Sequence, residues 1–456
     1  MIRLRGKTLR AHFFHAPTRH GGIVEGEDAL VAIDDSGTIA SVTPPDAPGY
    51  AAQRDAAMRD GTLVTLRPNT WLLPGFVDLH VHAPQYPQAG AALDVPLEVW
   101  LRTHTFPLEA RYADLAFARR VYAMLVRDLL VRGTTTALYF ATIHQEATRL
   151  LVDLCLEAGQ RALVGKVAMD DPRTCPDYCR DPSAAAALRG TRDLIDYIRA
   201  HPANREGRVQ PVVTPRFIPA CTDPLLADLG VLASDCGCHV QTHCSESDWE
   251  DGYVRARHGM RDAESLDRFG LLGRRSVLAH GNFLTAEDMD RLRARQAAVA
   301  HCPLSNAYFA GAVFPLRAAL EKGLHVGLGT DISAGASASL FDACRFALAA
   351  ARMLESGTDP ALPPERRGRG RARIGVEDAF HLATAGGGIA LDLPVGVFAP
   401  GYQFDAMLID PGAPGGSLRL FPEFDAGPRI LEKIIHTANE RNIVRVWVGG
   451  EAVAGG

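Results

Sequence analysis

The sequence predicts an α/β protein, namely a (β/α)8 barrel of the TIM type with a small β-sandwich domain built from both termini. From residue 74 onward, eight short apolar runs alternate with longer amphipathic stretches. Residues 1–73 and 395–456 lack this alternation and contain short strand-like segments with turns such as Asp-Ser-Gly. We therefore expect a discontinuous β domain over 1–73 and 395–456, and a catalytic barrel over 74–394.

Each of the eight apolar runs is expected to form one barrel strand. Between them, stretches such as residues 114–133 place apolar side chains at helical spacing and end on a glycine, which favours helix termination. Strand and helix alternating eight times predict a parallel sheet closed into a barrel. In chain order the runs are GFVDLHVH, TTTALYFA, RALVGKVAMD, VQPVVTPRF, CHVQTHCSE, SVLAHG, AAVAHCP and HVGLGTD.

Composition indicates an ordinary soluble protein. The 456 residues are 47% hydrophobic and 22% charged, with a formal net charge of -5, so bulk charge gives no support to nucleic-acid or membrane binding. The basic first residues lack the apolar core of a secretory signal, and a first β-strand is favoured over a transit peptide. Nine scattered cysteines favour reduced thiols and a cytoplasmic location. The one charge run, residues 363–373, is expected to be a solvated surface loop.

Histidines and acids stand at the ends of several of these runs. In a barrel of this kind the active site forms at the carboxyl ends of the strands, so these side chains are expected to converge. His80 and His82 are two residues apart and therefore point to the same face of their strand. Two buried imidazoles facing each other need a partner such as a divalent metal. The later strand ends add Arg216, Phe217, His243, Glu246, His280, His301 and Asp331.

Three histidine nitrogens and one carboxylate oxygen would suit zinc best, with iron(II) or manganese as alternatives. From the residues alone, Glu246 is favoured as an N-cap or first-turn acid of the following helix, because a helix N-terminus favours a negative charge. A cytidine-deaminase type of zinc site is not supported. His144 and Glu146 form an HxE pattern, but no PCxxC follows it in the sequence.

Several motifs together resemble one enzyme family. PGFVDLHVHAPQY, TPRF, QTHCSE, LAHG, HCPLSN and GLGTD are similar to the amidohydrolase superfamily. HAPQYP, TFPLEA and TPRF more narrowly resemble its guanine deaminases, and the likeness extends from about residue 70 to 410. This resemblance implies one metal ion per chain, since no lysine ends the fourth strand, and Lys166 is then a structural or salt-bridged lysine. The ligands that it implies are His80, His82, His243 and Asp331.

The resemblance also implies roles in catalysis. Asp331 would take the proton of the attacking water, and Glu246 would carry a proton to the ring nitrogen beside the attacked carbon. His280 would hydrogen-bond the attacking oxygen, whereas His301 would support the rim of the site.

The implied substrate is a purine, with guanine hydrolysed to xanthine and ammonia. A planar purine with a carbonyl oxygen needs a donor, an aromatic face and an amide, which Arg216, Phe217 and Gln85 would supply. The alternatives are a related deaminase or chlorohydrolase acting on a triazine, pterin, nucleoside or 8-oxoguanine, and a non-catalytic scaffold. By analogy with the family we expect a homodimer.

Overall fold

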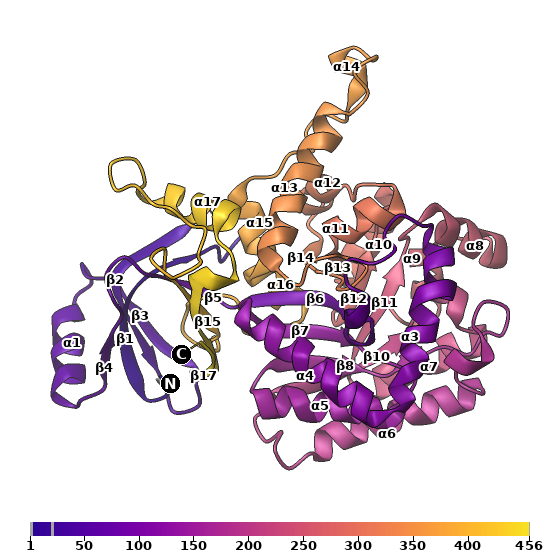
Figure 1. The fold of residues 1–456 in the computed structure, drawn as a ribbon, viewed down its shortest axis with the longest axis horizontal. Helices are drawn as coiled ribbons and strands as arrows, with labels where there is room; N and C mark the ends of the chain where they lie inside the picture. Colours follow the sequence, from indigo (N-terminus) through magenta and orange to yellow (C-terminus); the bar gives the residue numbers. More distant parts are fainter. Residues whose placement is uncertain (1–2, 20–21, 456) are drawn as a thin grey trace.

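Eight parallel strands form a barrel in the computed structural model, which describes residues 3–19 and 22–455 (Figure 1). Each predicted apolar run contains one of these strands, and every neighbouring pair in the series is parallel. The predicted barrel is therefore confirmed. In order around the barrel the strands are β6 (Phe76–His82), β7 (Thr134–Phe140), β8 (Arg161–Gly165), β10 (Val209–Pro215), β11 (His239–Cys244), β12 (Ser276–His280), β13 (Ala298–His301) and β14 (His325–Leu328).

Backbone hydrogen bonds beyond the end of β14 bring the chain back to β6. The amide of Asp331 donates to the carbonyl of His80 at 2.8 Å, and the amide of His82 donates to the carbonyl of Ile332 at 2.9 Å. The first strand and the segment after the last strand therefore lie side by side. This contact places Asp331 next to the two histidines of β6.

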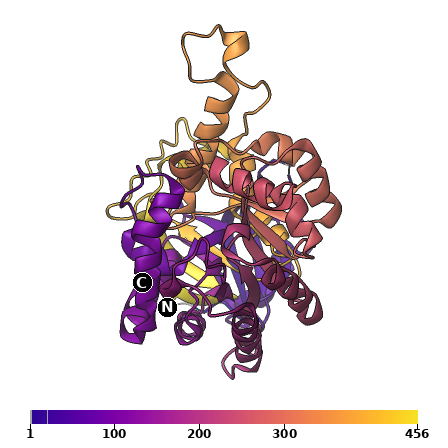
Figure 2. The same ribbon diagram turned by 90° about the vertical axis from the view of Figure 1, so that its right-hand side faces the viewer.

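Helices cover the outside of the barrel (Figures 1 and 2). The carboxylate of Asp114 caps the first of them by accepting from the amides of Ala116 and Phe117, and Gly133 follows its end with a φ of 83°. The principal helices are α4 (Leu115–Val131), α5 (Gln145–Ala158), α6 (Ala184–Ala200), α7 (Asp223–Cys236), α10 (Ala286–Arg295), α12 (Leu316–Glu321), α13 (Leu340–Ser356), α15 (Val376–Ala383) and α16 (Ala385–Ala390).

Short helical segments fill the connections at the carboxyl ends of the strands. The longest such connection leads from β6 to α4, and its residues also line the pocket described below. Its elements are η1 (Ala83–Gln88), α2 (Leu97–Trp100), η2 (Leu101–Thr105), α3 (Phe106–Ala110) and η3 (Arg111–Ala113). The other connections carry β9 (Val167–Ala168), η4 (Asp177–Cys179), η5 (Ile218–Ala220), α8 (Asp248–His258), α9 (Asp262–Arg268), α11 (Pro303–Ser305) and η6 (Asn306–Ala310).

A second sheet joins the two ends of the chain, as predicted (Figure 1). Its apolar core includes Leu9, Phe13, Phe404 and Trp447, which are buried together. Residues 1, 2, 20, 21 and 456 of the predicted β domain lie outside the described residues. The strands, in order across the sheet, are β17 (Glu451–Ala454), β16 (Ile443–Val448), β15 (Ala406–Ile409), β5 (Trp71–Pro74), β1 (Lys7–His15), β2 (Val24–Ile33) and β3 (Ile39–Thr43), with β4 (Leu63–Thr65) beside β1. The helices near this sheet are α1 (Tyr50–Arg59), α17 (Pro428–Thr437) and η7 (Glu440–Asn442).

The predicted surface loop at residues 363–373 contains the short helix α14 (Pro364–Arg367) and is mostly exposed. With the end of α13 it projects away from the barrel (Figure 1). All nine cysteines are free, in line with the expected reduced thiols. Among the described residues, every helix is too short or too polar to span a bilayer.

Candidate active site

Four histidines and two acids meet at the carboxyl end of the barrel. His80 and His82 come from β6, His243 from β11 and His280 from the end of β12. Asp331 follows β14, Glu246 follows β11, and all six side chains are buried. The Nε2 atoms of His82 and His243 are 3.0 Å apart, and Oδ1 of Asp331 lies 3.2 Å from Nε2 of His80 and 3.5 Å from Nε2 of His82. The predicted convergence of strand ends is thus observed.

Hydrogen bonds through Nδ1, the ring nitrogen that faces away from the cluster, orient two of the imidazole rings. Nδ1 of His243 donates to the carbonyl oxygen of Arg216 at 2.6 Å, and Nδ1 of His280 donates to Oδ1 of Asn306 at 2.9 Å. Each Nε2 then carries a lone pair that faces the cluster. Burial also lowers the pKa of His80, His82 and His243 well below the ordinary value. The neutral imidazole that results is the form that binds a metal.

Unpartnered atoms in this cluster fit a divalent cation. Nε2 of His80, Nε2 of His280 and Oδ1 of Asp331 are buried and have no hydrogen-bond partner among the described residues. Buried polar atoms normally have a partner, and a cation is one that lone pairs from nitrogen and oxygen can share. Three groups of potential ligands have their atoms within 4.8 Å of one another: His80, His82 and His243; His80, His280 and Asp331; and His243, Glu246 and His280.

The two carboxyl groups have perturbed proton affinities. Burial raises the pKa of Asp331 to about 6. Burial, with the charge of Asp331, raises the pKa of Glu246 well above its ordinary value. Oε1 of Glu246 lies 3.6 Å from Nε2 of His280. Helix α8 is capped by Ser247, whose hydroxyl accepts from the amide of Glu250, so Glu246 precedes the helix and lines the pocket instead.

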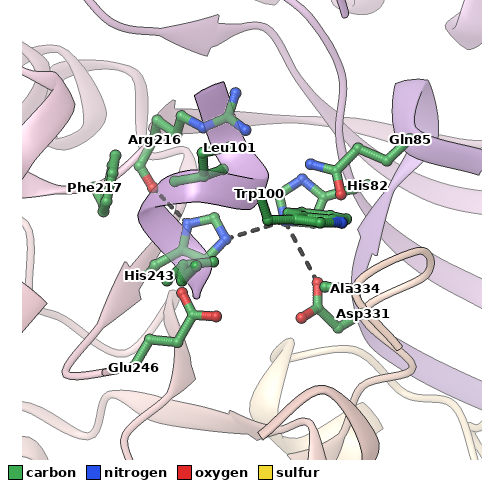
Figure 3. Close-up of a pocket in the computed structure, with 11 residues that line it drawn as sticks. His82, Gln85, Trp100, Leu101, Arg216, Phe217, His243, Glu246, Asp331 and Ala334 are labelled. Carbon is green, nitrogen blue, oxygen red and sulfur yellow. Dashed lines mark hydrogen bonds and ion pairs between the residues drawn. The ribbon is translucent and has the colours of Figure 1, made fainter. Parts of the chain in front are cut away.

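A pocket opens beside the histidines (Figure 3). Arg216 and Gln85 lie on one side of the histidine pair, and Glu246 and Asp331 lie on the other (Figure 3). A flat ligand could therefore contact both sets of side chains at once. The lining residues are His82, Gln85, Leu97, Trp100, Leu101, Arg216, Phe217, His243, Glu246, Asp331 and Ala334.

A buried carboxylate, Glu109, was missed by the sequence analysis as a site residue. It lies on α3 and contacts both Gln85 and Arg216. The motif TFPLEA, one of those that carry the narrower family resemblance, contains this residue and was the available signal. Trp100 and Leu101, from the same connection, were likewise not predicted to line the pocket.

Two other predicted residues lie outside the cluster. Nζ of Lys166 donates to Oδ1 of Asp181 at 2.7 Å, so this lysine is salt-bridged as expected. His301 is in none of the three ligand groups found in the described residues, and its ring packs against Phe314.

Comparison with known proteins agrees with this geometry. The sequence profile of the Amidohydrolase family matches residues 71–453. The chain therefore belongs to the amidohydrolase family.

Its relatives narrow the class to the guanine deaminases. It is 38% identical over 403 residues to a probable guanine deaminase of Schizosaccharomyces pombe, which covers 87% of this chain and 74% of that protein. It is 34% identical over 433 residues to the guanine deaminase of Homo sapiens, covering 93% of this chain and 92% of that protein. The crystal structure of guanine deaminase from C. acetobutylicum, with guanine bound in its active site, superimposes with a TM-score of 0.85 at 30% identity, covering 98% of this chain and 99% of the other.

Proposed function

We propose that this protein is a zinc-dependent guanine deaminase that hydrolyses guanine to xanthine and ammonia. The observation that carries the proposal is the pocket in which Arg216 and Gln85 face Glu246 and Asp331 across a cluster of buried histidines. The similarity to a structure with guanine bound in its active site supports the same substrate.

The residues that would hold the metal are His80, His82, His243 and Asp331. Three imidazole nitrogens and one carboxylate oxygen suit Zn²⁺ best, with iron(II) or manganese as alternatives. When bound, such an ion acts as a Lewis acid and lowers the pKa of a coordinated water toward about 7. We propose one ion per chain, because Lys166 is engaged by Asp181 rather than directed at the cluster.

Three side chains would bind the purine. The guanidinium of Arg216 donates to the carbonyl oxygen at C6, and the amide of Gln85 reads the neighbouring ring edge. Phe217 supplies an apolar face; its ring centroid lies 6.1 Å from that of His243. This arrangement directs the amino-bearing carbon C2 toward the acids on the opposite side of the pocket.

The acids would then move protons. Asp331 takes a proton from the attacking water, and Glu246 protonates the ring nitrogen next to C2 as the new C–O bond forms. Glu246 then moves the proton of the new hydroxyl group to the amino group, so that the carbon–nitrogen bond breaks and ammonia leaves, and the proton held by Asp331 returns to Glu246. His280, oriented by Asn306, hydrogen-bonds the attacking oxygen. The raised pKa of Glu246 suits this part, since the group must hold a proton near neutral pH.

The remaining expectations concern the cellular setting. We propose a cytoplasmic enzyme of purine catabolism that acts as a homodimer, by analogy with the family. The ligand is a small molecule, and the formal net charge of -5 favours neither nucleic acid nor an anionic membrane surface as a partner.

Ammonia release tests the proposal most directly. Purified protein would be assayed with guanine, 8-oxoguanine, adenine, cytosine and melamine, with and without a chelator. We expect guanine to be turned over fastest and chelation to abolish the activity. Faster turnover of another heterocycle would assign a different substrate, while a metal-free protein inactive on the whole panel would indicate a scaffold.

A further inference from the structure

One buried carboxylate holds both polar side chains that would read the purine. Oε2 of Glu109 accepts from Nη1 of Arg216 at 2.6 Å, and its Oε1 accepts from Nη2 of Arg216 at 3.0 Å. The same Oε1 also accepts from Nε2 of Gln85 at 3.0 Å. All three side chains are buried. Because Arg216 and Gln85 share one acceptor atom, their polar groups lie side by side.

The carboxylate fixes which end of the Gln85 amide faces the pocket. An ionised carboxylate can only accept hydrogen bonds, so the NH₂ group of Gln85 must point at Glu109. The other end of the amide, Oε1, is buried and has no partner within residues 3–19 and 22–455. Gln85 lines the pocket, and this unpartnered oxygen therefore offers a ligand a hydrogen-bond acceptor.

Glu109 also fixes the orientation of Arg216, which offers a ligand hydrogen-bond donors. Glu109 engages one N–H on each terminal nitrogen in a bidentate pair, which holds the guanidinium plane as well as its position. Phe106 lies against this plane, with its ring centroid 5.1 Å from the central carbon of the guanidinium. A guanidinium has five N–H donors and no acceptor, so it offers a ligand donors alone.

From this geometry we propose that Glu109 is a positioning residue for substrate selection. It presents a donor from Arg216 beside an acceptor from Gln85, and so selects a ring edge in which a carbonyl adjoins an N–H. This inference rests on the proposed function and deepens it. In guanine this edge is the C6 carbonyl and N1–H, and N1 is bonded to C2, the carbon that loses its amino group.

A suitable probe is 2,6-diaminopurine, which keeps the amino group at C2 but replaces the C6 carbonyl by an amine. Its edge offers a donor and then a bare ring nitrogen, the reverse of guanine. Against the arrangement held by Glu109, donor would meet donor and acceptor would meet acceptor. Sites built to hydrogen-bond a substrate reject such analogues strongly, because buried polar groups are left unpaired.

The experiment compares kcat/KM for guanine with that for 2,6-diaminopurine in the holoenzyme and three variants. We expect the wild type to prefer guanine by roughly 100-fold or more. Glu109→Gln allows the Gln85 amide to turn, and it should lower this ratio at least about tenfold, mainly through a raised KM for guanine. Glu109→Asp keeps the charge but is one methylene shorter. Its ratio should therefore lie between those of the wild type and Glu109→Gln.

Asp405→Asn is the matched control. Asp405 is a buried carboxylate in a bidentate pair with Arg161, with Nε to Oδ2 at 3.0 Å and Nη2 to Oδ1 at 3.3 Å, but it belongs to the neighbourhood of β15 and not to the pocket. The preference of the Asp405→Asn variant for guanine over 2,6-diaminopurine should equal that of the wild type. Circular dichroism and metal content would verify that each compared protein is folded and loaded.

The outcomes separate the two proposals. A wild type that releases no ammonia from guanine refutes the proposed function. A guanine-selective wild type whose folded Glu109→Gln and Glu109→Asp variants keep its ratio overturns the positioning role alone. Should Glu109→Gln not fold, Glu109→Asp decides by itself. A ratio that falls equally in Asp405→Asn would also overturn the inference, because the loss would then be general rather than local.

Discussion

Glu246 is buried beside His280 and within the influence of the charge of Asp331, and this combination makes its proposed catalytic role testable. Glu246→Gln preserves the size and much of the hydrogen bonding of the side chain but cannot exchange a proton. We expect it to keep its metal and lose roughly 10²-fold or more in turnover. His80→Ala should lose both metal and activity, because it deletes a proposed ligand. Metal analysis beside steady-state assays checks both, and a normal rate in Glu246→Gln would refute the proton-transfer role.

The difference between predicted and missed residues follows from how each is positioned. His80 and His82 could be found in the sequence because strand spacing and a strand end together fix where they point. Spacing does not fix where Glu109 points, because its position depends on a chain of short helical turns with no regular apolar period; only the TFPLEA motif marked this segment. Its partner Arg216 lies 107 residues further along the chain. Pairings of that kind are set by tertiary packing, which local sequence does not record.

At the level of elements, β1 is tied to the start of the C-terminal segment through a buried histidine. Nδ1 of His15 accepts from the amide of Phe398 at 3.2 Å, and its ring packs against Phe13 and Phe398. Burial lowers the pKa of His15 to about 4. Protonation would remove the acceptor and place a charge in an apolar setting, so the folded protein resists it.

This depressed pKa predicts a pH-dependent stability. An ordinary histidine pKa is near 6.5, so between about pH 6.5 and 4 the unfolded chain binds more protons than the folded one. The free energy of unfolding should therefore fall as pH is lowered through this window and be unaffected above it. Between pH 7.5 and 5 the contribution of His15 is about 2 kcal/mol. Denaturant titrations at pH 7.5 and pH 5 would test this contribution. Between these two pH values, the free energy of unfolding of His15→Asn should fall by about 2 kcal/mol less than that of the wild type. Equal losses in the two proteins would contradict the assignment.

The observed strands match the predicted ones closely where one apolar run forms one strand. The third run is an exception, because it divides into β8 and β9 on either side of Lys166. The side chain of Lys166 turns to Asp181, and the extended chain resumes beside β10. The eighth run also ends early, since β14 stops at Leu328 and Asp331 lies beyond it. The partner of Lys166 lies outside the sheet and that of Asp331 lies on the first strand, and apolar periodicity indicates neither contact.

At the scale of the whole molecule, the proposed metal site brings together side chains from the first strand of the barrel and from the segment after the last strand. His80 and His82 lie on the first strand, His243 on the fifth, and Asp331 beyond the eighth. These side chains meet only when the barrel is closed, so the unfolded chain lacks the site. Any ion bound there must stabilise the folded state by mass action.

Metal removal should therefore lower stability as well as activity. At a free metal concentration 1,000 times Kd the stabilisation is about 4 kcal/mol, which for a chain of this length corresponds to a shift of roughly 4–8 °C in the melting temperature. We expect chelation to lower the melting temperature by about this amount, and added Zn²⁺ to restore both stability and ammonia release. His80→Ala provides the control, because a protein that has lost a ligand should melt at nearly the same temperature with and without chelator. An unchanged wild-type melting temperature, despite complete metal loss, would show that the buried histidines and Asp331 are stable without a shared cation.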